Sequence, residues 1–229
     1  MKEKNKNKKI ERFISITCIV IILSFGTIIY NKLAQKRPSG LASRTIDSIQ
    51  NDDLNGYKLY LEKQLNKIKD KKLKIAVYNR LGKINLSLKK YPQALETYKN
   101  AYEIDPKNAG TCANLGLVLI QMHRYDEAIK YLNKAKSIDP KIPQIYNNLG
   151  VIFINKEKIP EAINNFKKAI KIDPKFYRAY TNLASAYVRL KNYQKAKDYI
   201  HQALKEGANK SPEFKQLLHD QLKTLKKLL

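Results

Sequence analysis

Few side chains in this sequence have the types and spacing that catalysis or metal binding would need. Its three histidines, His123, His201 and His219, belong to different predicted elements. The sequence has no zinc-ligand spacing, no glycine-rich phosphate loop and no nucleophile elbow. We therefore expect no catalytic residue, no bound metal and no cofactor. His123 is interpreted as a solvated turn residue, with a catalytic role as the alternative.

The two cysteines also lack partners of a recognisable kind. Cys18 lies in an apolar run and Cys112 in a predicted helical repeat, so there is no disulfide framework and no paired metal motif. Lipid attachment at Cys18 is an alternative, which the very short apolar stretch before it disfavours. Cysteine usage therefore indicates no particular redox compartment.

Basic side chains dominate the charge of the chain. There are 45 Lys and Arg against 20 Asp and Glu, which gives a formal net charge of +25. Such a charge favours anionic partners: nucleic acid, phospholipid headgroups or acidic proteins. The basic residues are nevertheless spread along the whole chain, a pattern that genome composition alone can produce. The apolar content of 43% is enough to build a core.

The amino-terminal segment is predicted to anchor the chain in a membrane. Residues 1–12 form a basic terminus, and residues 13–30 carry no charged side chain. As a helix, that run would be roughly 27 Å long, close to the thickness of a bilayer core. It ends in Ile28, Ile29 and Tyr30 without a small-residue cleavage site, which favours an uncleaved signal anchor over a cleavable signal peptide. The excess of basic residues before the span places the amino terminus in the cytoplasm and the rest of the chain outside.

A four-residue sequence, Ile-Asp-Pro-Lys, occurs three times at a fixed interval. It begins at Ile104, Ile138 and Ile172, and the two intervals are equal. A sequence that recurs at a fixed period of several tens of residues is typical of proteins built from stacked repeats. When the repeats are aligned, small residues recur where two helices must approach closely. These columns are Gly82, Gly116, Gly150 and Ala184; Ala94, Ala128, Ala162 and Ala196; and Ala101, Ala135, Ala169 and Ala203.

Each repeat is predicted to be a hairpin of two helices. Its apolar positions fall on one arc of each helix. Pro92 and Pro160 open the second helix in two repeats, where the missing N–H has no intrahelical acceptor anyway. The Asp-Pro pair closes the repeat because proline resists continuing a helix. The four predicted repeats are residues 75–108, 109–142, 143–176 and 177–208.

These columns resemble those of the tetratricopeptide repeat (TPR) family. The clearest match is in the second repeat, with Leu115, Gly116, Ala128, Ala135 and Pro140. The resemblance implies an all-α fold, a right-handed superhelical solenoid of hairpins, here preceded by a single transmembrane helix. The sequence departs from the family pattern in two places: Cys112 replaces an aromatic residue, and Ala208 stands where the fourth repeat should have proline.

The segments that flank the repeats are predicted to be a linker and short helices. Residues 31–44 form the linker, and residues 45–74 are helical, with a degenerate fifth hairpin as the alternative. Residues 209–229 are predicted to form a capping helix that covers the last hairpin, with a partner-binding helix as the alternative. Its apolar stripe consists of Phe214, Leu218, Leu222, Leu225 and Leu229.

The TPR resemblance also implies a concave groove, lined by the first helix of each repeat, where segments of other proteins bind. The groove columns are apolar in the middle and polar or basic at the ends, which suits an amphipathic peptide with acidic flanks. The alternative is that some of these residues only pack against their neighbours. The predicted groove residues are Asn79, Lys83, Leu86, Leu117, Ile120, Asn147, Val151, Ile154, Arg178, Ser185 and Arg189.

Two further features of the first helices are interpreted without a ligand. Asn114, Asn148 and Asn182 recur with the repeat, and hydrogen bonding between repeats explains them. One subclass of the family grips a carboxyl-terminal carboxylate with a Lys and an Asn in a set order. Here Asn79 and Lys83 stand in the opposite order, so we do not expect that clamp.

Together these features predict a non-enzymatic scaffold or adaptor that mediates protein–protein interaction. We expect a single-pass protein of a bacterial inner or cell membrane, with its repeats outside the cytoplasm, acting in envelope assembly, secretion or chaperoning. The anchor would raise the effective concentration of the groove near membrane partners. The alternatives are a basic binder of nucleic acid or an anionic polymer, and a regulatory subunit of an enzyme complex.

Overall fold

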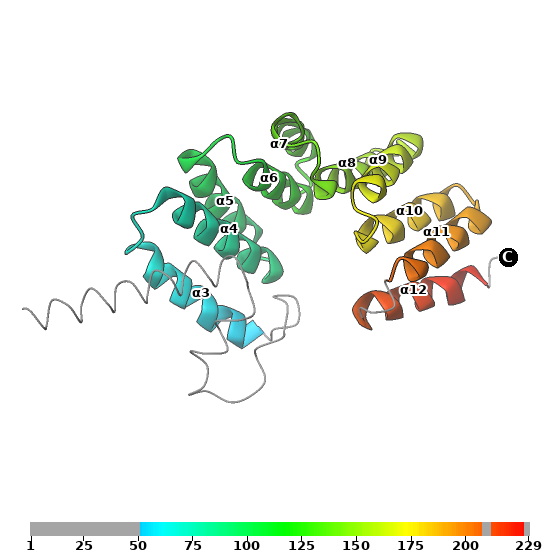
Figure 1. Cartoon of the computed structure of the whole chain (residues 1–229), viewed down its shortest axis with the longest axis horizontal. Coiled ribbons are helices and arrows are strands. Elements are labelled where there is room, and N and C mark those ends of the chain that lie inside the picture. Colours follow the sequence, from blue (N-terminus) through cyan, green and yellow to red (C-terminus); the bar gives the residue numbers. More distant parts are fainter. Residues whose placement is uncertain (1–50, 208–211, 227–229) are drawn as a thin grey trace, which may run out of the picture. The chain divides into compact units, whose positions relative to one another are not determined.

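The computed structural model describes residues 51–207 and 212–226 (Figure 1). Within these residues the chain forms helices joined by short turns and has no strand, which confirms the all-α prediction. The predicted membrane anchor, residues 13–30, lies outside the described part of the chain. None of the described helices combines the length and the apolar character that crossing a bilayer would require.

The described helices belong to two compact units, divided after Asp105. The N-terminal unit holds α3 (Asn51–Leu65), α4 (Lys71–Ser87) and α5 (Tyr91–Ile104). The C-terminal unit holds α6 (Ala109–Gln121), α7 (Tyr125–Ile138), α8 (Pro143–Asn155), α9 (Ile159–Ile172), α10 (Tyr177–Arg189), α11 (Tyr193–Lys205) and α12 (Pro212–Leu225).

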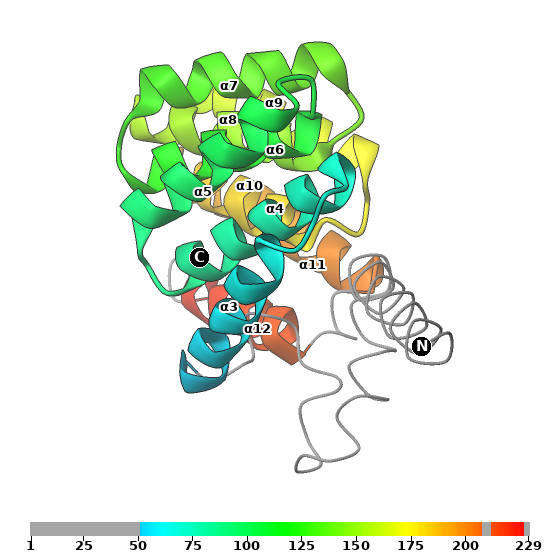
Figure 2. The same ribbon diagram turned by 90° about the vertical axis from the view of Figure 1, so that its left-hand side faces the viewer.

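Consecutive helices pack in pairs, and each pair is one hairpin. The pairs are α4 with α5, α6 with α7, α8 with α9 and α10 with α11, and the two views show the helices of a pair lying side by side (Figures 1 and 2). A turn of three residues joins the members of each pair. Its middle residue has a positive φ of 57° at Lys89, 58° at His123, 59° at Glu157 and 55° at Lys191.

The residue with positive φ in each turn allows the chain to reverse direction within three residues. In the second repeat the N–H of Arg124 bonds back to the carbonyl of Leu119 at 2.9 Å, which satisfies an open acceptor at the end of α6. His123 is exposed, and its Nδ1 lies 2.9 Å from the hydroxyl of Tyr125. The structure therefore places His123 in a turn at the surface.

The glycine column exists because a bulky side chain of the second helix lies against it. The pairs are Gly82 with Tyr98, Gly116 with Leu132 and Gly150 with Phe166. A Cβ added to Gly150 would lie 2.5 Å from the ring of Phe166, closer than carbon atoms can approach without a shift. In the fourth repeat Ala184 replaces glycine, and the bulky column holds Ile200, which is smaller than Tyr98 and Phe166.

The N-terminal unit is built around a small core between α3 and α4. Leu54 and Leu61 of α3 are buried against Val77, Leu81 and Ile84 of α4. The carboxylate of Asp70 accepts a hydrogen bond of 2.7 Å from the N–H of Leu73. This cap starts α4 at Lys71, four residues before the repeat boundary expected at residue 75.

The core of the C-terminal unit continues into the last helix. Leu218 and Leu225 of α12 are buried in the same cluster as Leu183 of α10 and Ile200 of α11. α12 packs directly on α11. The end of the last hairpin is therefore covered by an apolar face, as a stacked repeat needs at its terminus.

Candidate protein-binding groove

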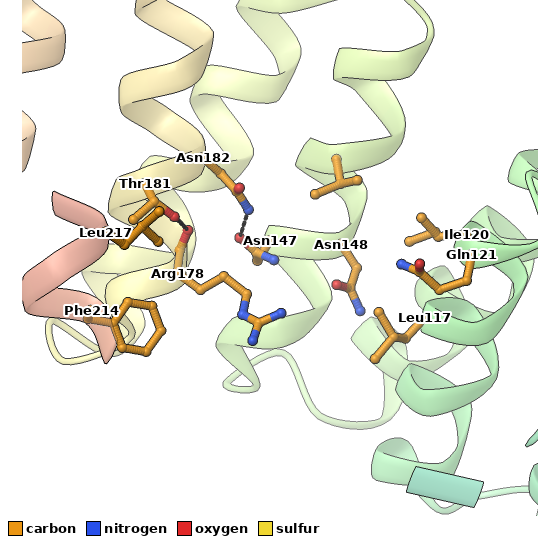
Figure 3. Close-up of a pocket in the computed structure, with 11 residues that line it drawn as sticks. Leu117, Ile120, Gln121, Asn147, Asn148, Arg178, Thr181, Asn182, Phe214 and Leu217 are labelled. Atoms are coloured by element: carbon orange, nitrogen blue, oxygen red, sulfur yellow. Dashed lines mark hydrogen bonds between the residues drawn. The ribbon is translucent and has the colours of Figure 1, made fainter. Parts of the chain in front are cut away.

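A groove in the C-terminal unit is formed by four helices that belong to successive repeats and to the terminal helix. The groove is open to solvent and has a volume of about 300 Å³, at the lower end of the range for ligand-binding clefts. Each of α6, α8, α10 and α12 contributes side chains (Figure 3). The lining residues are Leu117, Ile120, Gln121, Asn147, Asn148, Val151, Arg178, Thr181, Asn182, Phe214 and Leu217.

Apolar side chains lie at both ends of the groove. Leu117 and Ile120 come from α6, and Phe214 and Leu217 come from α12. Leu117 and Phe214 are half-buried, whereas Leu217 is 43% exposed. Ile120 is only 6% exposed. Because Leu117, Phe214 and Leu217 are not fully covered by their own chain, burying them against a partner would be favourable.

Amide side chains, with Val151 beside them, occupy the middle of the groove, where the sequence had predicted apolar residues. The Nδ2 of Asn182 donates a hydrogen bond of 2.8 Å to the Oδ1 of Asn147 (Figure 3). This bond joins α10 to α8, so hydrogen bonding between repeats is confirmed for Asn182. Asn147 and Asn148 are only 3% and 7% exposed, so both amides are held at the floor of the groove.

Arg178 supplies the charge of the groove. Among the described residues it is the only charged side chain of the lining, and no described acidic side chain pairs with it. Figure 3 shows its side chain extending from α10 toward Asn147 and Asn148. A guanidinium beside amide groups can bind a carboxylate or carbonyl oxygens of a ligand.

Two family models match the sequence. The model described as tetratricopeptide repeat matches residues 85–149, and the model described as regulator of microtubule dynamics protein 1-3 matches residues 152–229. No curated protein matches the sequence.

Several solved structures are similar to the fold. A thermophilic TPR protein of Thermus thermophilus has a TM-score of 0.66 at 17% identity and covers 75% of this chain and 91% of its own. A crystal structure of MamA has a TM-score of 0.55 at 24% identity, covering 70% and 92%. MamA of Desulfovibrio magneticus has a TM-score of 0.51 at 16% identity, covering 70% and 98%. These structures share the fold of this chain, and the tetratricopeptide repeat model matches part of its sequence.

Five of the groove residues predicted from the sequence line this groove. They are Leu117, Ile120, Asn147, Val151 and Arg178. Three others of the C-terminal unit lie outside it. Ile154 packs against the core, Ser185 donates its hydroxyl hydrogen to the carbonyl of Thr181 at 2.9 Å, and Arg189 is exposed at the end of α10.

The remaining three predicted groove residues, Asn79, Lys83 and Leu86, lie on α4 in the N-terminal unit. Lys83 is exposed, and the other two are half-buried. Binding of a partner by any of the predicted residues stays a prediction.

Six lining residues were not among the predicted groove residues. They are Gln121, Asn148, Thr181, Asn182, Phe214 and Leu217. The two asparagines had been interpreted as structural, and the last two belong to a helix interpreted as a cap. α12 starts at Pro212, only one residue later than a further repeat after Tyr177 would start. That spacing is the signal that could have placed α12 in the groove.

A basic and aromatic cluster of α9, α10 and α11 lies outside the groove lining. The ammonium groups of Lys167 and Lys195 are 6.0 and 5.7 Å from the ring centre of Tyr187, and the ring of Tyr199 stacks on Tyr187 at 5.5 Å. A hydrogen bond to Tyr187 raises the pKa of Lys167 above its usual value. Within the described residues there is no group of His, Cys, Asp or Glu side chains placed to hold a metal ion.

Proposed function

We propose that this TPR protein is a non-enzymatic scaffold or adaptor that binds a segment of another protein in the groove of its C-terminal unit. The observation that carries the proposal is the combination of uncovered apolar side chains at the ends of the groove with Arg178 and buried amides between them. The TPR match and the TPR structures support a protein–protein interaction scaffold.

The chemistry of the lining indicates what the partner segment contains. Leu117 and Val151 offer apolar contacts, and Arg178 offers a positive charge that no described carboxylate neutralises. The complementary ligand is an extended or helical segment with apolar anchors and an acidic flank. A basic segment would place like charges together in the groove and would be rejected.

We also propose that residues 13–30 anchor the protein in a bacterial cell membrane, with the amino terminus in the cytoplasm and the groove outside. The support is the absence of charged side chains from this run and the excess of basic residues on its amino-terminal side. A tethered groove meets membrane partners at high effective concentration, so weak contacts suffice. Envelope assembly, secretion and chaperoning are processes in which such an adaptor would act.

Crosslinking in intact membranes, followed by identification of the adduct, tests the proposal. We expect Leu117→Glu combined with Val151→Glu to abolish the adduct, because two carboxylates would face an apolar and acidic ligand. The matched control is Leu59→Glu combined with Leu190→Glu, since both leucines are exposed and lie outside the groove. Arg178→Glu, at an exposed side chain, is a second variant if the groove double variant does not fold. If the adduct persists both in the groove double variant and in Arg178→Glu, the proposal that the partner binds in this groove is wrong.

A second candidate function, binding of an anionic polymer, is favoured by the cluster of Lys167, Lys195 and Tyr187. Ammonium groups can hold the phosphate backbone of such a polymer. Binding of a single-stranded oligonucleotide would then weaken steeply with salt. Lys167→Gln with Lys195→Gln would reduce that binding, whereas the Leu117 and Val151 variants would leave it unchanged.

A further inference from the structure

α12 occupies the place in the chain where the first helix of a fifth repeat would lie. α8, α10 and α12 begin at Pro143, Tyr177 and Pro212, so the second interval is one residue longer than the first. Leu218 follows Leu183 by the same longer interval, and both side chains are fully buried. α12 therefore continues the series of groove-lining helices, displaced by one residue.

The residue before each buried leucine of this series lines the groove. In α8 and α10 that residue is Asn148 or Asn182, and in α12 it is Leu217. Capping the last hairpin is accomplished by Leu218 and Leu225, which are buried, while Leu217 does not belong to that core. Leu217 is thus an exposed leucine at a position that holds asparagine in α8 and α10, and it is not part of the core that caps the last hairpin.

Phe214 lies one turn before Leu217 and is held in place at the end of the groove. Its ring packs against the ring of Tyr177 with the centroids 5.9 Å apart and the planes at 64°. The hydroxyl of Tyr177 in turn donates to the carbonyl of Glu206 at 3.1 Å. Phe214 and Leu217 thus form an apolar surface whose aromatic half is positioned in advance, which lowers the entropy cost of binding.

We propose that α12 is a wall of the binding site as well as a cap, and that Phe214 and Leu217 select the partner. These two side chains seat a large apolar residue of the partner segment, and Arg178 binds a carboxylate close to that residue. The inference rests on the proposed function and narrows it. The occupant is a segment of another protein in which Leu, Ile, Met or Phe stands a few residues from Asp or Glu.

Charge complementarity identifies this occupant rather than a second copy of the chain. The groove carries the positive charge of Arg178 and, among described residues, no acid. The chain as a whole has a formal charge of +25, so two copies repel each other while an acidic segment is attracted. The volume of about 300 Å³ has room for a few side chains of such a segment.

Selection from a displayed library of random peptides on the full chain, held in detergent micelles, tests the proposal. Binding of a selected, fluorescently labelled peptide is then measured for Leu217→Asn, which installs the amide found in α8 and α10. The matched control is Leu190→Asn, because Leu190 is 49% exposed and outside the groove. We expect Kd to rise about tenfold or more for Leu217→Asn, no change for Leu190→Asn, and the same thermal midpoint for both.

Each other outcome has a distinct meaning. Equal Kd values for the two variants, with binding still lost in Leu117→Glu with Val151→Glu, would overturn the role of α12 and leave the proposed function standing. If the selected peptides carry no acidic residue near the apolar anchor, the proposed binding of a carboxylate by Arg178 is wrong. A dimer of the free chain that Leu217→Asn dissociates would make a second copy the occupant. A library without any groove-dependent binder would overturn the proposed function itself.

Discussion

At the scale of single residues, equivalent tyrosines in two repeats differ in whether the hydroxyl has a hydrogen-bond partner. Tyr146 and Tyr180 stand at equivalent positions of successive repeats. The hydroxyl of Tyr146 donates to the carbonyl of Pro140 at 3.0 Å. The hydroxyl of Tyr180 is buried and, within the described residues, has no hydrogen-bond partner. Cys112, in the same column, directs its sulfur to the carbonyl of Pro106 at 3.8 Å.

Removing the two hydroxyls should therefore have different effects on the free energy of unfolding. Tyr146→Phe loses a hydrogen bond and leaves an acceptor unpaired, which costs about 1 kcal/mol. Tyr180→Phe removes a buried polar group that lacks a partner, so stability should stay the same or rise. Chemical denaturation of both variants measures the difference. An equal loss of stability in both variants would show that the two hydroxyls contribute equally to the free energy of unfolding.

Stability at alkaline pH should depend on Tyr180. Burial raises the pKa of Tyr180 to about 12, above the value of about 10 in the unfolded chain. Because the folded state holds this proton more tightly, its contribution is complete below pH 10 and declines as the pH rises from about 10 to about 12. The stability difference between wild type and Tyr180→Phe should shift in favour of the variant across this range. A difference that is constant from pH 8 to pH 12 would contradict the expectation.

At the scale of the helices, the hairpins depend on contacts between a small and a large residue. Gly150 allows α8 to lie close enough to α9 for the ring of Phe166 to fill the space between them. Ile154, predicted to line the groove, packs instead against the core, where α9 also lies. Ile154 is not among the residues that line the groove.

Gly150→Ala should destabilise the C-terminal unit by about 1–3 kcal/mol, since the fully buried ring of Phe166 would have to move. Gly56→Ala is the matched control within α3, because no atom lies within 4 Å of the added Cβ. Alanine there should be neutral or should stabilise the helix by up to about 1 kcal/mol. Thermal unfolding of the two variants gives the comparison, and equal midpoints would show that the close approach is not limiting.

At the scale of the whole molecule, the proposed anchor and the groove have separate tasks. In the proposal, the anchor would concentrate the chain at a bilayer, and the groove would select what is bound there. Deleting residues 13–30 should move the protein from the membrane fraction to the soluble fraction, because the long uncharged run would be lost. A selected peptide should bind the shortened chain with unchanged Kd. Retention in carbonate-washed membranes would assign membrane attachment to another part of the chain.

The sequence allowed much of the helical organisation to be predicted, and part of the groove. Leu117 and Val151 were found because they recur at repeat positions on the exposed arc of a helix, which depends only on local periodicity. Phe214 and Leu217 were missed because the helix that carries them lacks the repeat columns and starts one residue out of step with the repeats. Asn148 was missed because a repeated amide has the same pattern whether it faces a neighbour or a ligand.

By itself the sequence determined the period of the repeat and the all-helical hairpins, since helix periodicity and the limits that proline and glycine set are properties of neighbouring residues. Only the tertiary structure decided that α12 lines the groove with Leu217 while it caps the core with Leu218. The physical reason is that coverage of a side chain depends on helices distant in sequence. Adjacent residues on one helix can therefore have opposite surroundings.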